Sequence, residues 1–457
     1  MNRWNLGWLI TIPVFVITGL VFAYSAPVRR EHEEDYKLLR LFADVLNEVD
    51  QNYVRELDSK ARRELVENMI ECGLEKLDPH TTYFNEREFQ QFRIKNKGKF
   101  GGVGITVTRE INNKGLLVAS PIAGTPAYES GIQPGDIITK VDGVPLENKK
   151  SSDAIDLIIG APGTPVTLTV LHEGESDPVD IPLTRATIEV PTVVGDVRKP
   201  DEPKEWDFIY DKDHKIAYVR ILEFGEQTAN DLRHVLDSLD AQGVNGLVID
   251  LRANPGGLLK SAVQISDMFL TDGAIVSTRR RRSEDNETFS AKRDNYAWED
   301  PVKHPVAILI DQFSASASEI VSSALQDNHR ATIIGERSYG KGSVQNLKPF
   351  EDGKTALKIT IASYWRPSGK NIHRFPDMRE SDDWGVRPDP GFAVALTDQE
   401  RKDYFAGRRF RDIVTSKSGH MPEKLRQKIE APFHDKVLDR AMQHLRDQLG
   451  ANAKTAE

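Results

Sequence analysis

The sequence predicts an α+β protein that is divided into several domains. At 457 residues the chain is long enough for two to four domains, each with a sizeable core. Residues 31–95 and 401–457 carry apolar side chains at helical spacing, whereas the region between them holds short apolar runs bounded by glycine and proline. We therefore expect helical regions near both ends and mixed α/β domains between them.

Composition narrows the classes of partner and cofactor. Charged residues make up 29% of the chain and the formal net charge is −9, so a nucleic-acid partner has no support. The chain has one cysteine, Cys72, which excludes an internal disulfide and which we expect to be buried or half-buried. Histidines are scattered and no His-Glu-x-x-His pattern occurs, so we expect neither a metal nor another cofactor.

The first thirty residues predict export. An apolar run extends from about Leu6 to Ala23, with no charge before Arg29, and its length is near the ~17–25 residues that span a bilayer. The small residues around Ser25 would also suit a cleavage site. Residues 1–30 are therefore a transmembrane anchor or, as the alternative, a removable signal peptide. A single-pass anchor in a cell (inner) membrane would leave the bulk of the chain facing the periplasm or the outside.

Residues 31–95 are expected to form two or three amphipathic helices. They end at the segment Leu77–Phe84, LDPHTTYF, where Pro79 stops the last helix and a capped turn follows. We interpret His80 as a hydrogen-bonding residue of this turn rather than as a metal ligand.

Residues 96–187 predict a small β-rich domain. A glycine-rich loop, Gly98–Ile105, enters an alternating strand, and consecutive N–H groups in such a loop can converge on an anion. A helix is expected over Ser152–Ile159 and a closing strand over Val166–Leu171.

Residues 188–400 alternate between strands and helices, as expected for a mixed α/β core. Here the basic run Arg279–Arg282 lies beside an acidic one and predicts a solvated loop. The expected strands are Ile216–Ile221, Gly246–Leu251, Val306–Ile310 and Ala331–Ile334, and the expected helices are Ala229–Leu239 and Ala262–Leu270.

The strand Val306–Ile310 leads into the segment on which the functional prediction depends. Small residues, SASAS, follow it and open a helix, so a serine hydroxyl can lie at a helix N-terminus where N–H groups stabilise negative charge. A serine nucleophile needs a base, and Lys341, flanked by two glycines, is the candidate that follows. Burial can lower a lysine pKa by ~3–5 units, which would make it a base near neutral pH.

SASASEIVSSALQD followed by YGKGSVQ resembles the signature of the carboxyl-terminal processing proteases, the tail-specific serine peptidases of family S41. The resemblance implies that Ser316 is the nucleophile, Lys341 the general base and Gln345 the residue that orients the lysine. LDPHTTYF and LRANPGG also resemble family motifs. The second implies an oxyanion hole made by the N–H of Ala317 with that of Gly256 or Gly257, a choice that the sequence leaves open.

Residues 96–187 resemble a PDZ domain, a partly open β-barrel with helices that binds the C-terminal tail of a protein. The resemblance implies a substrate with an unstructured C-terminal tail, which the domain would capture, or a domain that gates the active site. The expected peptide-binding residues lie on the glycine-rich loop, the strand after it and the groove helix: Gly101, Gly102, Val103, Gly104, Ile105, Ala154, Ile155 and Ile158.

The predicted organisation is thus an anchor or signal peptide (1–30), a helical region (31–95), a PDZ domain (96–187), a Ser-Lys protease core (188–400) and C-terminal helices (401–457). Helices at both termini could pack together or build a homo-oligomer. The alternative function is a PDZ scaffold, or an inactive relative, that binds tails without cutting them. A Ser-His-Asp arrangement using His304, His329 or His373 also stays open, although no Gly-x-Ser-x-Gly motif is present.

Overall fold

The computed structural model describes residues 33–112, 115–199, 202, 204–292, 298, 300–414, 426–427 and 433–456. The chain divides into two compact units, Met1–Leu77 and Asp78–Glu457. The anchor or signal peptide expected over residues 1–30 lies outside the described residues. Within the described ranges, every helix is too short or too polar to cross a bilayer.

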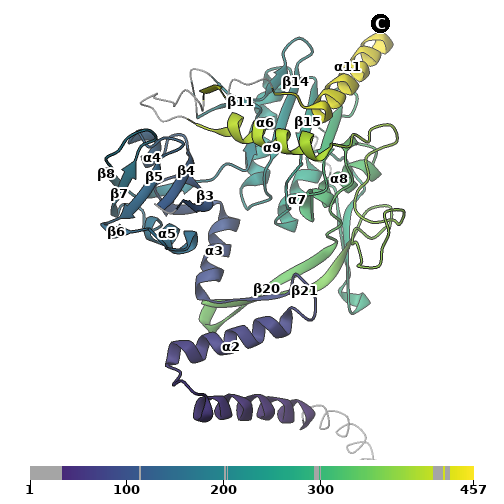
Figure 1. The fold of residues 1–457 in the computed structure, drawn as a ribbon. Helices are drawn as coiled ribbons and strands as arrows, with labels where there is room; N and C mark the ends of the chain where they lie inside the picture. The colour runs from purple at the N-terminus through teal and green to yellow at the C-terminus, as the bar shows by residue number, and fades with distance from the viewer. Residues whose placement is uncertain are drawn as a thin grey trace, which may run out of the picture. The chain divides into compact units, whose positions relative to one another are not determined.

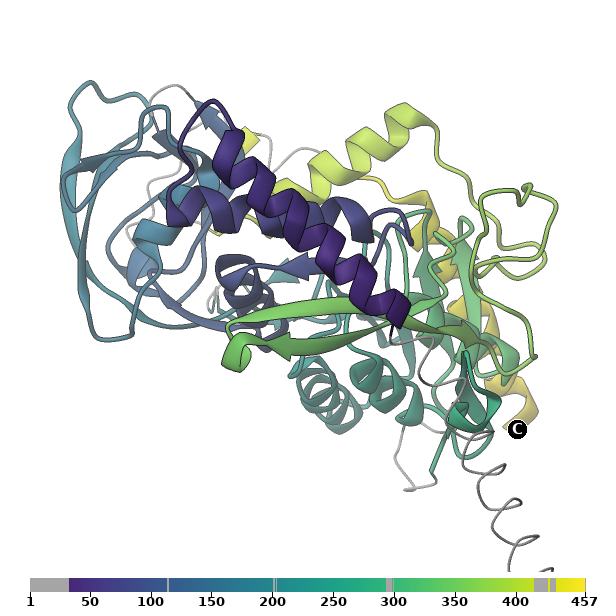
Figure 2. The same ribbon diagram turned by 90° about the horizontal axis from the view of Figure 1, so that it is seen from below.

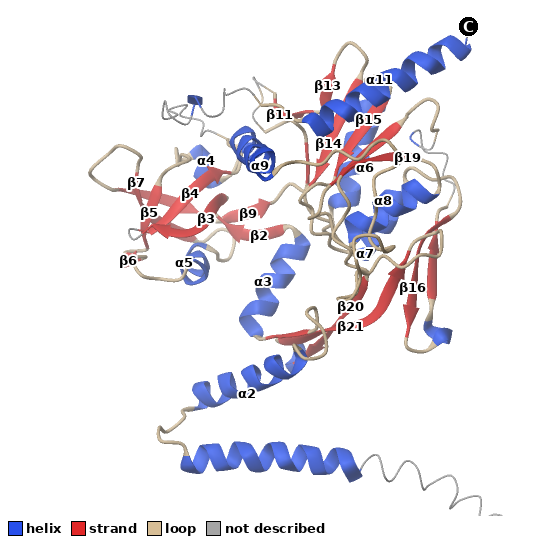
Figure 3. Ribbon diagram, turned by 45° about the vertical axis from the view of Figure 1, so that its right-hand side comes forward, coloured by secondary structure: helices blue, strands red, loops and turns tan. Residues whose placement is uncertain are grey.

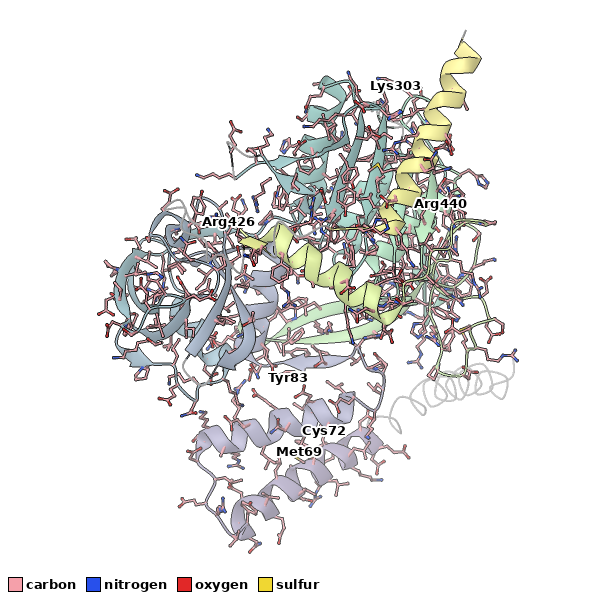
Figure 4. All side chains as sticks on the ribbon, turned by 45° about the horizontal axis from the view of Figure 1, so that its top comes forward. Met69, Cys72, Tyr83, Lys303, Arg426 and Arg440 are labelled. Carbon is pink, nitrogen blue, oxygen red and sulfur yellow. The ribbon has the colours of Figure 1, made fainter. Side chains whose placement is uncertain are left out.

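The described part of the first unit consists of a helix over residues 33–52 and of α2 (Ser59–Leu74), as predicted. Asp58 caps α2 by accepting a hydrogen bond from the Ala61 N–H at 2.7 Å. Cys72 lies on α2 (Figure 4) and is exposed, so the prediction of a buried or half-buried cysteine was wrong. Its helix buries no residue, which leaves no core for the thiol to enter. Large apolar side chains of this unit are also exposed: Tyr36, Leu38, Leu39, Leu41 and Ile70.

The second unit begins with β1 (Thr82–Phe84) and α3 (Glu86–Lys97) and continues into the expected β-rich domain. A short antiparallel ribbon of β2 (Lys99–Gly102) and β9 (Ala186–Glu189) joins the two ends of that domain. Its sheet has the order β3-β4-β5-β7-β8 and encloses a core that includes Leu116 and Leu168, both fully buried. The elements are β3 (Ile105–Asn112), β4 (Gly115–Pro121), α4 (Pro126–Glu129), β5 (Ile137–Val141), β6 (Val144–Pro145), α5 (Ser151–Ile158), β7 (Pro165–Leu171) and β8 (Val179–Thr184).

The α/β core is built on a sheet of order β10-β14-β15-β18-β19, in which β14, β15, β18 and β19 are parallel. These strands are almost wholly buried because helices cover both faces. Helices α6, α7 and α8 cover one face and α11 covers the other (Figure 1). The elements are β10 (Val193–Val194), β13 (Ile209–Asp211), β14 (Ile216–Ile221), α6 (Thr228–Ala241), β15 (Gly246–Asp250), α7 (Leu259–Asp267), β18 (Val306–Ile310), α8 (Ala317–Asp327), β19 (Ala331–Gly335) and α11 (Lys436–Ala456).

A second sheet has the order β1-β21-β16-β17, and β20 pairs with β21 in a long antiparallel hairpin (Figures 2 and 3). The loop predicted over Arg279–Arg282 was wrong in part, because β16 extends to Arg280. The guanidinium of Arg279 lies 3.5 Å from the ring centroid of Trp365 on β21, and this stacking holds the basic run in the sheet. The elements are β16 (Ala274–Arg280), β17 (Glu287–Ser290), β20 (Ser343–Phe350) and β21 (Thr355–Trp365).

Buried ion pairs hold the C-terminal helices on the core. Arg252, which follows β15, contacts Asp250 and Asp435, each at 2.6 Å, and all three side chains are almost fully buried. Arg408, on α9 (Asp398–Asp412), pairs with Asp196 at 2.6 Å. Arg440 of α11 (Figure 4) stacks on Phe392 of the core. The apolar face of α11 is buried on the sheet of its own chain, and a homo-oligomer built by the terminal helices stays a prediction.

Candidate active site

The candidate nucleophile, Ser316, lies in a tight turn between β18 and α8. Its backbone has φ 55° and ψ −112°, which a residue with a side chain adopts only where its surroundings impose it. Here Ser314 anchors the turn, because its hydroxyl donates to the Leu251 carbonyl at 2.8 Å, and the Ala315 N–H donates to the Asn254 carbonyl at 3.0 Å. The turn thus places Ser316 at the start of α8, as predicted, and against the loop that contains Gly256.

Glu319, in the first turn of α8, joins the candidate nucleophile to the candidate base. Its Oε2 accepts hydrogen bonds from the backbone N–H of Ser316 and of Lys341, both at 2.8 Å. Its Oε1 accepts from the Gly340 N–H at 2.6 Å and from the Ser338 hydroxyl at 2.5 Å. Burial raises the pKa of Glu319 to about 7, against the opposing effect of these four donors. One carboxylate therefore fixes both sides of the candidate dyad.

Lys341 lies on the loop between β19 and β20. The Arg374 N–H donates to the Gly340 carbonyl at 2.9 Å and the Tyr364 N–H donates to the Gly342 carbonyl at 2.6 Å, so the backbone on both sides of the lysine is held. Burial lowers the pKa of Lys341, and the nearby charge of Lys358 lowers it further. Among the described residues, the Lys341 ammonium has no ion-pair partner. These are the conditions under which a lysine can lose its proton near neutral pH.

The Gln345 amide bonds two hydroxyl groups of the β20–β21 hairpin. Its Nε2 donates to the Ser343 hydroxyl at 2.9 Å and to the Thr360 hydroxyl at 3.2 Å. Orientation of Lys341 by Gln345 therefore stays a prediction. Thr360 in turn donates to Asp78 Oδ1 at 3.1 Å, which brings the LDPHTTYF turn to the same place.

That turn has the predicted cap. The Asp78 carboxylate accepts from the His80 N–H at 2.8 Å, from the Thr81 N–H at 3.0 Å and from the Thr81 hydroxyl at 2.6 Å. His80 also lines a cavity of about 870 Å³ beside Lys341, which sequence reasoning missed. Thr360 donates to Asp78 and accepts from Gln345, and both bonds depend on tertiary contacts that no local sequence pattern predicts.

The two glycines of the candidate oxyanion loop differ in what their N–H groups do. The Gly256 N–H donates to Asn254 Oδ1 at 2.8 Å, whereas the Gly257 N–H has no partner among the described residues. Gly256 has φ 99°, and a Cβ there would lie 2.7 Å from Ser316 Cβ and 2.9 Å from the Ala317 nitrogen. The loop therefore packs directly against the start of α8, and only a glycine fits at position 256.

The expected peptide-binding residues lie around β3 and α5. Gly101 and Gly102 pair with β9 in the ribbon, and Val103 is buried. On α5, Ala154 and Ile158 are buried in the core of the domain, so Ile155, which is partly exposed, is the one of the three that presents surface. The Arg87 guanidinium on α3 pairs with Asp153 and Asp156 of α5, each at 2.8 Å. The edge of β3 opposite β4 pairs with no other described strand.

The three histidines left open by the sequence lie in different places. His304 is 1% exposed and its ring is 4.4 Å from that of Trp298, which marks it as a core residue. His329 follows the C-terminal end of α8, whereas Ser316 precedes its N-terminal end. Of the three, His373 alone lines the cavity beside Lys341.

Comparison with known proteins agrees with this geometry. Residues 215–389 match the model of peptidase family S41 and residues 117–171 match that of the PDZ domain. The chain is 35% identical over 452 residues to the carboxy-terminal-processing protease of Bartonella bacilliformis, covering 95% of this chain and 94% of that one. The chain belongs to peptidase family S41, among the carboxy-terminal processing proteases.

Other relatives of this S41 peptidase carry similar names. It is 32% identical over 311 residues to the carboxy-terminal processing protease CtpA of Bacillus subtilis, covering 68% of this chain and 62% of that one. A solved structure of the photosystem II D1 C-terminal processing protease is 28% identical, covers 78% of this chain and 92% of that chain, and superposes with a TM-score of 0.40. The S41 match contains Ser316, Lys341, Gln345 and the Gly256–Gly257 loop.

Proposed function

We propose that this S41 peptidase is a serine endopeptidase that uses a Ser316–Lys341 dyad to cleave proteins near their C-terminus. The observation that carries the proposal is the bridge through Glu319 Oε2, because one oxygen bonds the backbone of both residues at 2.8 Å. A binding module has no need to fix a strained serine and a half-buried, unpaired lysine around one buried carboxylate.

In the proposed first step, neutral Lys341 Nζ takes the proton of Ser316 Oγ while Oγ attacks the scissile carbonyl. The N–H groups of Gly257 and Ala317 then donate to the oxyanion, and one such donor is typically worth about 3 kcal/mol. We assign Gly257 rather than Gly256 because the Gly256 N–H is already bonded to Asn254.

Collapse of the tetrahedral intermediate breaks the C–N bond, and the leaving amine takes the proton from the Lys341 ammonium. Water then attacks the resulting acyl-serine ester, with Lys341 accepting its proton. Breakdown of the second intermediate returns that proton to Ser316 and releases the new carboxyl terminus.

The PDZ domain supplies recognition of the substrate in this proposal. A disordered C-terminal tail would pair with the free edge of β3 and lie beside α5, with its carboxylate at the loop that contains Gly104. The ion pairs between Arg87 and the acidic residues of α5 would connect an occupied groove to α3 and hence to β1, which pairs with β21 of the core.

The test compares the full chain with Ser316→Ala and Lys341→Arg on a model protein that bears a disordered, apolar C-terminal tail. Arginine keeps the charge but cannot act as a base, so both variants should bind the tail without cleaving it. Lys303→Arg, an exposed lysine labelled in Figure 4, is the matched control and should cleave normally. Cleavage by Ser316→Ala would reject the dyad, and binding without cleavage by the wild type would favour the tail-binding scaffold.

We also propose that the chain acts at the cell envelope, anchored by residues 1–30 or exported after their removal. A second copy of the chain is the proposed cover for the exposed apolar residues of the first unit, such as Leu38 and Leu41, which are 65% and 60% exposed. Fractionation with antibody detection tests the first point. Light scattering tests the proposed second copy by comparing the mass of the wild type with that of the double variant Leu38→Glu/Leu41→Glu. Equal masses would reject it.

A further inference from the structure

The proposed chemistry of Ser316 and Lys341 does not explain the cavity that lies beside Lys341. It measures about 870 Å³ and reaches from the loop around Gly340 to the segment 373–384. This volume exceeds what a single side chain fills, so the cavity can take a short stretch of a bound chain. Its position at the base places it next to the residues that flank the scissile bond.

Two large aromatic side chains lie exposed on this cavity. Phe313 is 43% exposed and Tyr339 is 54% exposed, and both line the cavity. Both backbones are held by the turn that precedes Ser316: the Phe313 N–H donates to Asp311 at 3.0 Å and the Tyr339 N–H donates to the Ser314 carbonyl at 2.9 Å. The same turn therefore positions the two rings and the candidate nucleophile.

Apart from Asp78 and the candidate base Lys341, the charged residues on the cavity wall are already paired. Glu336 pairs with Arg401 at 2.6 Å, and Arg374 pairs with Glu380 at 3.0 Å. Arg337 donates to the carbonyls of Glu380, Asp382 and Trp384, and its guanidinium stacks on Trp384 at 3.4 Å. A charged substrate side chain would lose water here without gaining a partner, because Asp78 already accepts four hydrogen bonds and Lys341 is neutral when it acts as the base. An apolar side chain has no such hydration to lose.

We propose that Phe313 and Tyr339 form a specificity subsite that takes a bulky apolar or aromatic substrate side chain beside the scissile bond and rejects acidic and basic ones. This inference rests on the proposed peptidase function and adds the class of residue at one position of the substrate. An aromatic pair supplies contact area at little entropic cost, and sites with such anchors carry most of the binding energy in protein recognition.

The experiment first finds the cleavage site in a model tail by mass spectrometry of the products of the full chain. Each residue within three positions of that site is then changed in turn to Phe, Leu, Gly, Glu or Lys. At one position kcat/KM should fall by about tenfold or more from Phe or Leu to Gly, and further to Glu or Lys. Equal cleavage of all tails overturns the subsite and leaves the peptidase standing, whereas no cleavage of any tail rejects the proposed function itself.

Variants of the protease then locate the subsite. Tyr339→Ala and Phe313→Ala should lose most of the preference for Phe over Gly at that position. Phe350→Ala is the matched control because Phe350 is also 43% exposed but does not line the cavity. Since these side chains are exposed, all three variants should unfold at the temperature of the wild type. A Phe-to-Gly ratio equal to the wild-type ratio in both cavity variants overturns the assignment.

Discussion

The Glu319 carboxylate accepts a hydrogen bond from the Lys341 N–H at 2.8 Å, although the rest of α8, β19 and the following loop separate the two residues by 22 positions. The carboxylate is fully buried, so this bond and the three beside it replace water completely. The candidate base is thus held through its backbone, which leaves its ammonium group free to exchange a proton.

Glu319→Gln should reduce kcat strongly. The amide NH₂ would face N–H donors that now bond a carboxylate oxygen, so at least two of the four hydrogen bonds are lost, at about 1–3 kcal/mol each. We expect a loss of about a hundredfold in kcat with a small change in KM, measured by initial rates on a model tail. Glu284→Gln, which changes an exposed carboxylate beside Arg282, is the control. Wild-type rates in the Glu319 variant would show that the bridge does not position the dyad.

The raised pKa of Glu319 also predicts how the free energy of unfolding changes with pH. Because the folded state holds this proton up to about pH 7 and the unfolded chain releases it near pH 4.5, the residue makes the unfolding free energy fall as pH rises between these values. The slope is at most ~1.4 kcal/mol per pH unit. Glu319→Gln should remove this contribution. Urea titrations of the wild type and of Glu319→Gln at pH 5 and pH 7.5 measure this contribution. If the unfolding free energy changes equally with pH in the two proteins, the prediction is wrong.

Lys358→Met should shift the pH–rate profile. Lys341 must be neutral to act as a base, so the rate rises with pH through the pKa of this lysine. The charge of Lys358 lowers that pKa, and its removal should move the rising limb to higher pH without reducing the plateau rate. Lys354→Met, an exposed lysine at the turn of the same hairpin, should leave the profile in place. An unchanged profile in Lys358→Met would show that this charge does not tune the base.

Gly256→Ala should abolish cleavage and lower stability. The added Cβ would lie 2.6 Å from the Ala315 carbonyl oxygen and 2.7 Å from Ser316 Cβ, so the oxyanion loop or the nucleophile turn must move. Gly369→Ala separates this clash from backbone strain, because Gly369 also has a positive φ, 78°, but has no heavy atom within 4 Å of the added Cβ. It should cost only about 1 kcal/mol and keep activity. Activity is measured on the model tail, and stability by thermal unfolding. Equal losses of activity and stability in Gly256→Ala and Gly369→Ala would show that backbone strain, rather than the clash, causes the effect.

The buried arginine beside the oxyanion loop gives a further prediction. Arg252→Met leaves Asp250 and Asp435 buried without their shared partner, and breaking such a pair typically costs about 3–5 kcal/mol. Urea unfolding measures the loss. The comparison is Arg282→Met, an exposed arginine that pairs with Asp285 and should cost less than about 1 kcal/mol. A loss below that level in Arg252→Met would show that the network contributes little.

Much of the fold could be predicted because its elements have distinct local patterns. The parallel strands are near-continuous apolar runs, and the helices of the core carry apolar residues at helical spacing, so the prediction of a mixed α/β core between helical ends was confirmed. The strand through Arg279 was missed because its stability depends on stacking against Trp365, a residue far along the chain. The exposure of Cys72 was missed for a similar reason, since helical spacing alone does not show whether a partner covers the helix.

The candidate site likewise contains residues that local motifs predict and contacts that only the folded chain shows. Ser316 and Lys341 lie in short motifs with their own chemical logic, whereas the four bonds of Glu319 come from residues 316–341 folded onto one another. A glutamate three residues after a helix N-cap predicts a capping box, and that signal could have drawn attention to it. No local signal predicts that Thr360 meets Asp78 across 282 residues.

The pairing of Arg252 with Asp435 bears on when the site can form during synthesis of the chain. The candidate oxyanion loop follows an arginine whose partner lies 183 residues later in the chain, and the sheet that leads to Ser316 lacks the cover of α11 until that helix has been synthesised. We therefore expect that a growing chain does not assemble a competent site before α11 has been made. A chain ending at residue 430 tests this: it should keep the PDZ domain and show no hydrolysis, and cleavage by it would remove α11 from this timing role.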